Sequence, residues 1–111
     1  MKDADTFVAM IHIIGAFYIE DDVRLFCVNA PEKWTDAGKE MKQAVIDMDL
    51  GPATFVLIKE DSFGRWIAFV TPEGWDETLQ QRLYRMGAPL WHGLNKTERA
   101  ICEDHMKGIT P

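Results

Sequence analysis

The sequence lacks the short motifs that mark the common classes of enzyme. Its 111 residues contain no Walker A sequence, no G-x-G-x-x-G, no G-x-S-x-G and no H-E-x-x-H. Those motifs supply a phosphate cradle, an activated serine or a zinc site. We therefore expect that the protein is not an enzyme and that it requires no cofactor or metal ion.

Positive charge is also scarce. The chain has 12 Lys and Arg against 18 Asp and Glu, which gives a net charge of −6. Residues 1–51 contain five basic and ten acidic side chains, so most of the excess lies in the first half. Binding to a phosphate backbone or to an anionic membrane needs clustered cations. The sequence thus disfavours direct nucleic-acid or membrane binding and favours a protein partner with a basic surface.

Cysteine is rare, and no apolar stretch is long enough to cross a membrane. The two cysteines, Cys27 and Cys102, are expected to be reduced and buried, although a disulfide bond between them is possible. The apolar run 7–17 is too short for a membrane span, and it follows Asp3 and Asp5 rather than the cationic start of a secretion signal. We therefore expect a cytoplasmic protein.

The sequence contains many apolar side chains, 47% of the total, which is enough for one folded domain over residues 1–111. The clearest element is a β-hairpin over residues 54–71. Both of its arms are rich in β-branched and aromatic residues, and the polar stretch 60–64 between them contains Gly64 as a turn residue.

A second hairpin is predicted near the N-terminus. Residues 6–19 are apolar at almost every position and form its first strand, with a bulge or bend at Gly15. The polar run Glu20–Asp22 forms the turn, and residues 23–28 form the returning strand. A helix over residues 6–20 remains an alternative, because apolar runs of this kind are compatible with both structures.

Apolar residues at three- and four-residue spacing predict three helices. The first begins at Pro31 or Thr35 and ends at Gly51. The second begins at the Thr71-Pro72-Glu73 sequence and ends at Gly87.

The third helix is capped by Asn95 or Thr97 and ends at Gly108. The whole chain therefore predicts an α+β fold in the order β-β-α-β-β-α-α. Its sheet is antiparallel, built from the two hairpins, and the helices pack on it.

The distribution of charge suggests a binding surface. On the first predicted helix four polar side chains lie in a line beside the apolar side, and the turn adds three more acidic residues. The proposed binding residues are Asp36, Glu40, Gln43, Asp47, Glu20, Asp21 and Asp22. Such a ridge could offer carboxylates to a basic groove in the way that a nucleic acid offers phosphates. The alternative is an ordinary solvated helix face.

A second candidate surface is apolar. Trp91 and His92 lie in a loop between proline and glycine residues, and Tyr84 points away from the apolar side of its helix. An aromatic side chain in such a loop either covers the core or anchors a partner. These three residues, or an exposed hairpin edge, could make the protein an interaction module or a homodimer.

A third candidate is chemical. Cys102 and His105 are three residues apart on the last predicted helix, so a thiol could contact an imidazole there. The same spacing is half of a zinc site, but no second pair completes it. Since both residues lie on the apolar side of the helix, a structural role is the simpler interpretation.

In size, acidity and lack of motifs the chain resembles small phage-encoded inhibitors of bacterial nucleases and defence complexes, anti-CRISPR proteins among them. The resemblance rests on no particular residues. It implies a small inhibitor that binds a basic nucleic-acid-handling protein, and fold or composition alone does not establish that function.

Overall fold

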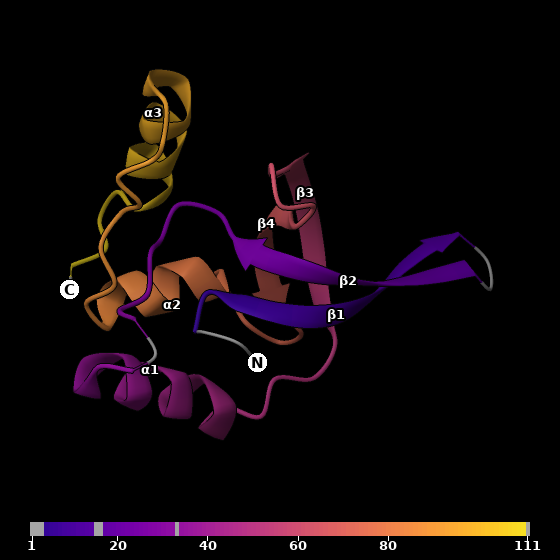
Figure 1. Ribbon diagram of the computed structural model, residues 1–111. Helices are drawn as coiled ribbons and strands as arrows, with labels where there is room; N and C mark the ends of the chain where they lie inside the picture. The colour runs from indigo at the N-terminus through magenta and orange to yellow at the C-terminus, as the bar shows by residue number, and fades with distance from the viewer. Residues whose placement is uncertain (1–3, 15–16, 33, 111) are drawn as a thin grey trace.

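The structure is a computed structural model that describes residues 4–14, 17–32 and 34–110. It is an α+β fold in which a four-stranded sheet stands beside three helices, as shown in Figure 1. The elements are β1 (Thr6–Ile14), β2 (Phe17–Leu25), α1 (Asp36–Asp47), β3 (Ala53–Glu60), β4 (Trp66–Pro72), α2 (Leu79–Arg85) and α3 (Lys96–His105). The predicted order of strands and helices is therefore confirmed.

The sheet is mixed, so the prediction of a purely antiparallel sheet was wrong. The strand order is β1-β2-β4-β3, and the two hairpins meet where β2 pairs in parallel with β4. This pairing is short and joins Val23–Leu25 to Trp66–Ala68. Sequence pattern identifies each hairpin because its contacts are local. It does not reveal which edges of two hairpins meet, because that pairing depends on packing between distant segments.

The first hairpin reverses at a different point from the predicted one. Its strands pair from Thr6 with Arg24 to Ile14 with Phe17, so Glu20–Asp22 are not the turn, and the bulge or bend predicted at Gly15 lies outside the described residues. The strand prediction for this region is confirmed, and the helical alternative is wrong. Glu20–Asp22 lie within β2 and do not form a turn. Pairing of Ile14 with Phe17 gives two strands of nine residues each, whereas a turn at Glu20–Asp22 would leave much of β1 without a partner.

The hairpin of β3 and β4 forms as predicted. Its turn is organised by Asp61, whose Oδ1 accepts hydrogen bonds from the backbone N–H groups of Phe63 and Arg65, both at 2.9 Å. Gly64 adopts a φ of 79°, which other residues reach only with strain. The side chain of Arg65 completes the turn by donating to Asp61 at 2.7 Å.

Helix α1 begins at the second of its two predicted caps. Thr35 is the N-cap, and its hydroxyl oxygen accepts the backbone N–H of Gly38 at 3.0 Å. The buried side of the helix includes Met41 and Val45, in agreement with the apolar spacing of the sequence. The carbonyl oxygen of Glu32 accepts both the hydroxyl and the backbone N–H of Thr35, so the chain folds tightly before the helix.

We expect that Gly38→Ala destabilises the protein by about 1–3 kcal/mol, the usual cost of forcing extra volume into a packed site. A Cβ at position 38 would lie 1.8 Å from the carbonyl oxygen of Glu32, so the segment before α1 would have to move. Urea unfolding followed by circular dichroism measures the loss. The control is Gly51→Ala, where a Cβ would meet nothing within 4 Å. Equal stability of the two variants would contradict this close approach.

The caps of the last two helices differ in how well the sequence indicates them. Helix α3 begins at Asn95, which forms the predicted capping box with Glu98. Helix α2 does not begin at Thr71 as predicted, because Pro72 is the last residue of β4. Its N-cap is Thr78, which forms a capping box with Gln81. Proline is accepted at the end of a strand as well as at the start of a helix. The presence of Pro72 therefore led to a predicted start of α2 that lies before its actual N-cap.

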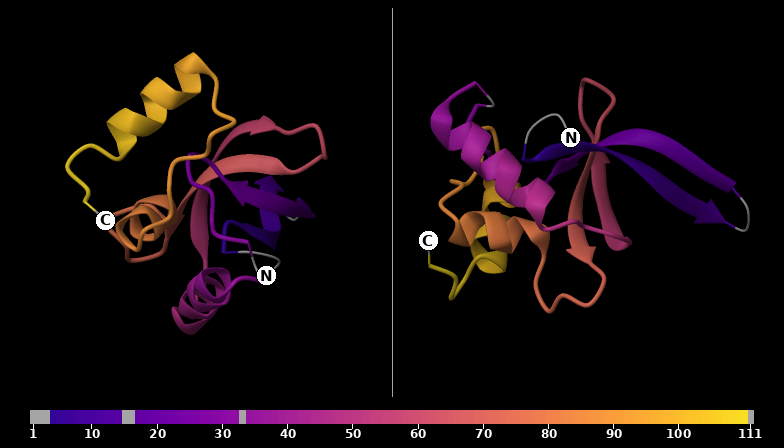
Figure 2. Two further views of the ribbon diagram at one scale, coloured as in Figure 1. Left: turned by 60° about the vertical axis from the view of Figure 1, so that its left-hand side comes forward. Right: turned by 90° about the horizontal axis from the view of Figure 1, so that it is seen from below.

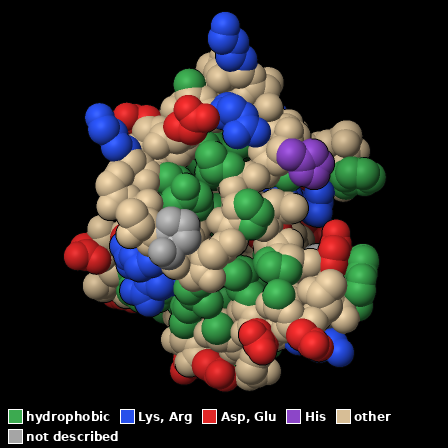
Figure 3. Space-filling model, turned by 90° about the vertical axis from the view of Figure 1, so that its left-hand side faces the viewer, with side chains coloured by type: hydrophobic (Ala, Val, Ile, Leu, Met, Phe, Trp, Pro, Cys, Tyr) green, Lys and Arg blue, Asp and Glu red, His purple; other side chains and the backbone are tan. Residues whose placement is uncertain are grey.

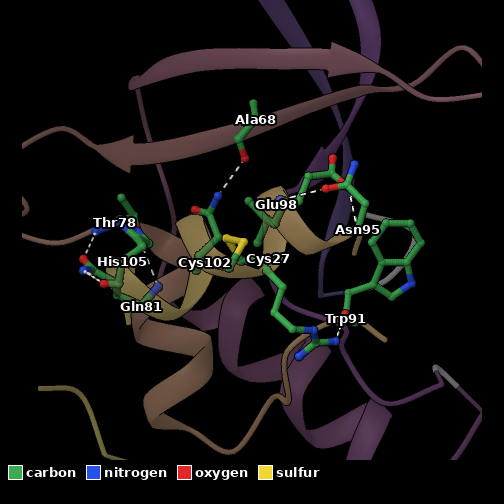
Figure 4. The surroundings of a disulfide bond; sticks show 12 residues. Cys27, Ala68, Thr78, Gln81, Trp91, Asn95, Glu98, Cys102 and His105 are labelled. Atoms are coloured by element: carbon green, nitrogen blue, oxygen red, sulfur yellow. Dashed lines mark hydrogen bonds between the residues drawn. A yellow bond between two sulfur atoms is a disulfide. The ribbon is translucent and has the colours of Figure 1, made fainter. Parts of the chain in front are cut away.

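The two cysteines form a disulfide bond, which corrects the expectation of two reduced thiols. Cys27 follows β2 and Cys102 lies on α3, and the bond joins residues 75 apart in sequence with a Cα–Cα distance of 5.4 Å. Figure 4 shows the bond that joins α3 to the segment following β2. Both side chains are fully buried, as expected. Sequence spacing did not indicate the pairing, because proximity of such distant residues is a property of the fold.

Candidate protein-interaction surface

A hollow in the structure lies between strands that are at opposite edges of the sheet. The sheet curls so that β1 and β3 approach each other, and the rings of Phe7 and Phe55 lie 6.5 Å apart. Between these strands and the C-terminal end of α1 there is a groove of about 760 Å³. Its walls are residues 7–12, 45–46, 49–52, the alternate positions 53, 55 and 57, and residue 70. We call this hollow the β1–β3 groove, and its volume is typical of ligand sites.

The two strands contribute to the groove in different ways. From β3 only alternate residues line it, so β3 presents one of its faces. From β1 every residue between Phe7 and His12 lines it, so the backbone edge of β1 itself borders the groove. Within the described parts of the chain β1 pairs only with β2. The amide and carbonyl groups of Phe7–Ile11 that face away from β2 are therefore available to a further strand.

The hairpin that carries this edge extends away from the rest of the molecule, as Figure 2 shows. Only Val23–Leu25 of β2 pair with β4, so among the described residues its outer part is two strands wide. Met10 is 61% exposed and Val8 is 50% exposed on β1. Two-stranded ribbons are marginally stable in water, and exposed apolar side chains on one edge are typical of interaction sites.

Acidic side chains lie around the groove. Asp49 is part of its wall, and none of the described residues that line it is Lys or Arg. Asp21 pairs across the hairpin with Ala9, so the two side chains share the face of the sheet that borders the groove. Glu20 pairs with Met10 on the opposite, outer face. The predicted acidic run therefore belongs to a strand beside the groove rather than to a turn.

The other predicted acidic residues lie on α1. Asp36, Glu40, Gln43 and Asp47 are all exposed, as the sequence indicated. Figure 3 shows acidic side chains along the lower margin of the molecule, where α1 lies. Gln43 Nε2 donates to Asp47 Oδ1 at 2.8 Å. Helix α1 and the hairpin are separate elements, so the structure does not merge the ridge and the Glu20–Asp22 run into one surface.

A smaller hollow lies on the other side of α1. It has a volume of about 370 Å³, and Met41, Ala44 and Met86 are among the residues that line it. Glu40 of the acidic ridge is at its margin. This hollow is shallow and presents no strand edge, so it offers a partner fewer hydrogen-bonding groups than the β1–β3 groove does.

The predicted aromatic surface of Tyr84, Trp91 and His92 is only partly open to a partner, because Trp91 makes contacts within the protein. Trp91 packs against the core, and the guanidinium of Arg24 lies 4.7 Å from its ring centroid. The backbone N–H of Trp91 donates to the carbonyl oxygen of Cys27 at 2.7 Å. His92 is exposed and Tyr84 is half-buried. Trp91 thus covers the core, which was one of its two predicted roles.

The predicted pair of Cys102 and His105 cannot act as a nucleophilic dyad in this structure. The Cys102 sulfur is bonded to Cys27 and carries no thiolate. His105 Nε2 lies 2.8 Å from the hydroxyl oxygen of Thr78, as Figure 4 shows. That hydroxyl already accepts the N–H of Gln81, so its proton is free to be donated to a neutral imidazole. The histidine therefore joins α3 to the cap of α2.

We expect stability to fall as pH falls below the ordinary histidine pKa of 6.5. Burial lowers the pKa of His105, and Asp104 opposes this only in part. The unfolded chain then binds a proton at a pH where the folded protein does not, so the contribution present above 6.5 is lost on acidification. Urea unfolding at a series of pH values measures it. In His105→Gln the slope near that pH should shrink, and an unchanged slope would show that another group causes it.

Two further observations concern chemistry and membranes. In the described ranges no three His, Cys, Asp or Glu side chains are grouped so that they could hold a metal ion. None of the described helices is both long enough and apolar enough to span a membrane.

Comparison of the chain with protein-family models and with curated protein sequences finds no match.

Proposed function

We propose that this protein is a non-catalytic interaction module that binds another protein through the β1–β3 groove. The observation that supports the proposal is a large apolar groove bordered by a strand edge that no described strand covers. The proposal takes up the interaction module that the sequence offered as an alternative, with the exposed hairpin edge as the contact and not Trp91 and Tyr84. Buried aromatic and aliphatic anchors beside available backbone groups are typical of peptide-binding sites.

The charge around the groove supports a basic partner. Asp49 lines the groove and Asp21 lies on the adjoining face, while the exposed carboxylates of Asp36, Glu40 and Asp47 on α1 add to the negative field. Such a field speeds association with a basic surface and weakens with salt. Inhibition of a nucleic-acid-handling protein is one function that fits this charge, but the groove points to a protein ligand of any activity.

The disulfide bond bears on where the protein works. The expected cytoplasmic location depended on two reduced cysteines, and Cys27 and Cys102 are instead bonded to each other. Disulfide bonds persist mainly in oxidising compartments. We therefore extend the proposal to a location outside the reducing cytosol.

Photo-crosslinking tests the binding site and captures a partner whose identity is still open. The photoreactive residue p-benzoylphenylalanine replaces Met10, which belongs to the β1 edge of the groove and whose 61% exposed side chain lies on the outer face beside that edge. A matched variant carries it at Phe63, which is 83% exposed in the β3–β4 turn. Both are expressed in the native host and irradiated. We expect an adduct with another protein from position 10 and none from position 63.

A third variant locates the contact if the groove is not used. The same residue at Glu40 samples the acidic side of α1 and the smaller hollow. Adducts from position 40 but not from position 10 would refute the groove and transfer the function to α1. Adducts at all three positions would indicate non-specific contact and would also refute it.

A further inference from the structure

We infer that the ligand of the β1–β3 groove is an extended strand, in which apolar side chains that enter the groove alternate with basic ones that face outward. This inference rests on the proposed function, since it specifies the partner of the same site. The strand would add to the edge of β1 and extend the sheet by β-augmentation.

The backbone of β1 selects an extended ligand. Phe7–Ile11 line the groove consecutively, so their edge offers alternating N–H and C=O groups over a length of about 16 Å. A helix satisfies its own backbone groups and could not pair with this edge, and a small apolar molecule would leave it unpaired. An added strand supplies both the hydrogen bonds and the side chains.

The sequence of β1 does not prevent such pairing. Thr6–Ile14 contains no charged residue and no proline. Natural proteins usually protect a long exposed edge with lysine, proline, a bulge or a covering segment. The irregularity in the register of β1 lies between His12 and Ile14, beyond the stretch Phe7–Ile11, which carries none of these protections. The opposite edge strand, β3, ends with Lys59 and Glu60.

The two faces of the added strand would meet different surroundings. One face would enter the apolar groove beside Phe7, Ala9 and Phe55. The other would lie beside the exposed side chains of Val8 and Met10. Glu20 is one strand further along that outer face, at about 10 Å from the added strand. Lys and Arg suit this position, since their aliphatic stems can cover Met10 while their charges approach Glu20.

Negative charge at the groove favours a strand from another protein over the β1 strand of a second copy of this chain. The described residues of the groove wall include Asp49 and no Lys or Arg, and the whole chain carries a net charge of −6. The β1 strand of a second copy would bring no positive charge to compensate. A basic strand from another protein fits the charge better than this protein fits itself.

Synthetic peptides provide the test. The probe is a fluorescent peptide of four Lys-Val repeats, and its matched control has four Glu-Val repeats. A third peptide has the Lys-Val sequence with alternate backbone nitrogens methylated, so that one edge cannot hydrogen-bond. By fluorescence anisotropy we expect the Lys-Val peptide to bind at least about tenfold more tightly than either control. In hydrogen exchange it should protect β1 amides, with no comparable effect on β3.

Charge variants make the test specific to the groove. Glu20→Gln with Asp49→Asn removes one charge from the outer face of the hairpin and one from the groove wall, and Asp36→Asn with Glu40→Gln removes two charges from α1. Asparagine is suitable at position 49 because Asp49 has a φ of 49°, which asparagine tolerates. We expect the first pair to weaken Lys-Val binding about tenfold and the second to change it less than about threefold.

The outcomes separate this inference from the proposed function. Adducts from Met10 without protection of β1 by the Lys-Val peptide would retain the groove as a binding site and overturn the inference. Equal binding of the Lys-Val and Glu-Val peptides would also overturn it. A dimer in sedimentation experiments, with β1 amides protected in the absence of peptide, would identify a second copy as the occupant. Absence of adducts from Met10 would refute the proposed function itself.

Discussion

Reduction of the disulfide bond should lower the free energy of unfolding by about 4.5 kcal/mol. The bond between Cys27 and Cys102 closes a loop of 75 residues, and the loss of loop entropy in the unfolded chain gives this value. Measured effects of native disulfides are typically 2–5 kcal/mol. Urea unfolding of the same protein with and without reductant gives the difference directly, with no side chain replaced. A Cys27→Ala/Cys102→Ala variant should resemble the reduced protein.

The reduced protein should loosen first at α3. Apart from the disulfide, the polar contacts of this helix with the rest of the fold include the ion pair of Lys59 with Glu98 at 2.5 Å and two contacts of His105. Its Nε2 lies 2.8 Å from the hydroxyl oxygen of Thr78, and its carbonyl oxygen accepts a hydrogen bond from Gln81 Nε2 at 2.9 Å. These polar contacts are partly exposed and weaker than a covalent link. Hydrogen exchange in Lys96–His105 should therefore accelerate more than exchange in β4.

A surface variant provides the control for the disulfide. Lys59→Met removes the ion pair with Glu98, but the Lys59 side chain is 44% exposed, so the expected loss is below about 1 kcal/mol. Alkylation before reduction tests the bond itself, and it should label neither cysteine. Two labelled thiols in the untreated, folded protein, or equal stability of its oxidised and reduced forms, would contradict the pairing.

The sequence was informative wherever structure depends on near neighbours. Apolar spacing located α1, the capping box identified Asn95 as the start of α3, and the polar stretch around Asp61 and Gly64 located the second hairpin turn. Each of these features is decided within a few residues, by a cap, a turn or a repeating face. These features can therefore be predicted from the sequence pattern of a few neighbouring residues.

The sequence failed where distant segments compete. The run Glu20–Asp22 has the composition of a turn, but the gain from pairing all of β1 with β2 places it inside a strand. The parallel contact of Val23–Leu25 with Trp66–Ala68 and the bond between Cys27 and Cys102 leave no local trace. Long-range contacts of this kind require the whole packing arrangement to be known.

The candidate site was predictable only in part. The acidic residues of α1 were correctly expected on the surface, but the β1–β3 groove was not identified. One signal was present: Thr6–Ile14 is a strand without any charge or proline, which is unusual for a sheet edge. Whether that strand lay at an edge or in the centre could not be determined from its own sequence. The curl that forms the groove depends on all four strands.

Replacement of Arg24 by Met should destabilise the protein by about 3–4 kcal/mol, because it leaves a buried carboxylate without its cation. The guanidinium lies 3.8 Å from Asp5 Oδ2, and the side chains of both residues are less than a tenth exposed, at 7% and 8%. Burial lowers the pKa of Arg24, while the charge of Asp5 raises it. The arginine also donates to the carbonyl oxygen of Leu25 at 3.1 Å.

A double-mutant cycle separates the ion pair from the lost packing. Asp5 accepts the backbone N–H of Ala30 at 2.8 Å and the hydroxyl of Thr6 at 3.0 Å, and an asparagine can retain part of this network. Asp5→Asn/Arg24→Met should therefore lose less stability than the sum of the single variants, with a coupling of about 1–3 kcal/mol. Urea unfolding of the four proteins measures it.

An arginine in an exposed ion pair is the matched control for Arg24. Arg85 pairs with Glu77 at 2.8 Å, but its side chain is 49% exposed, so Arg85→Met should cost less than about 1 kcal/mol. The difference between the two variants isolates the effect of burial, because the substitution is the same. Similar losses of stability in Arg24→Met and Arg85→Met would show that the buried carboxylate of Asp5 is not stabilised by Arg24. Strict additivity in the double-mutant cycle would show the same. The cluster around Asp5 would then be held by the hydrogen bonds of its carboxylate with Ala30 and Thr6 and by backbone hydrogen bonds.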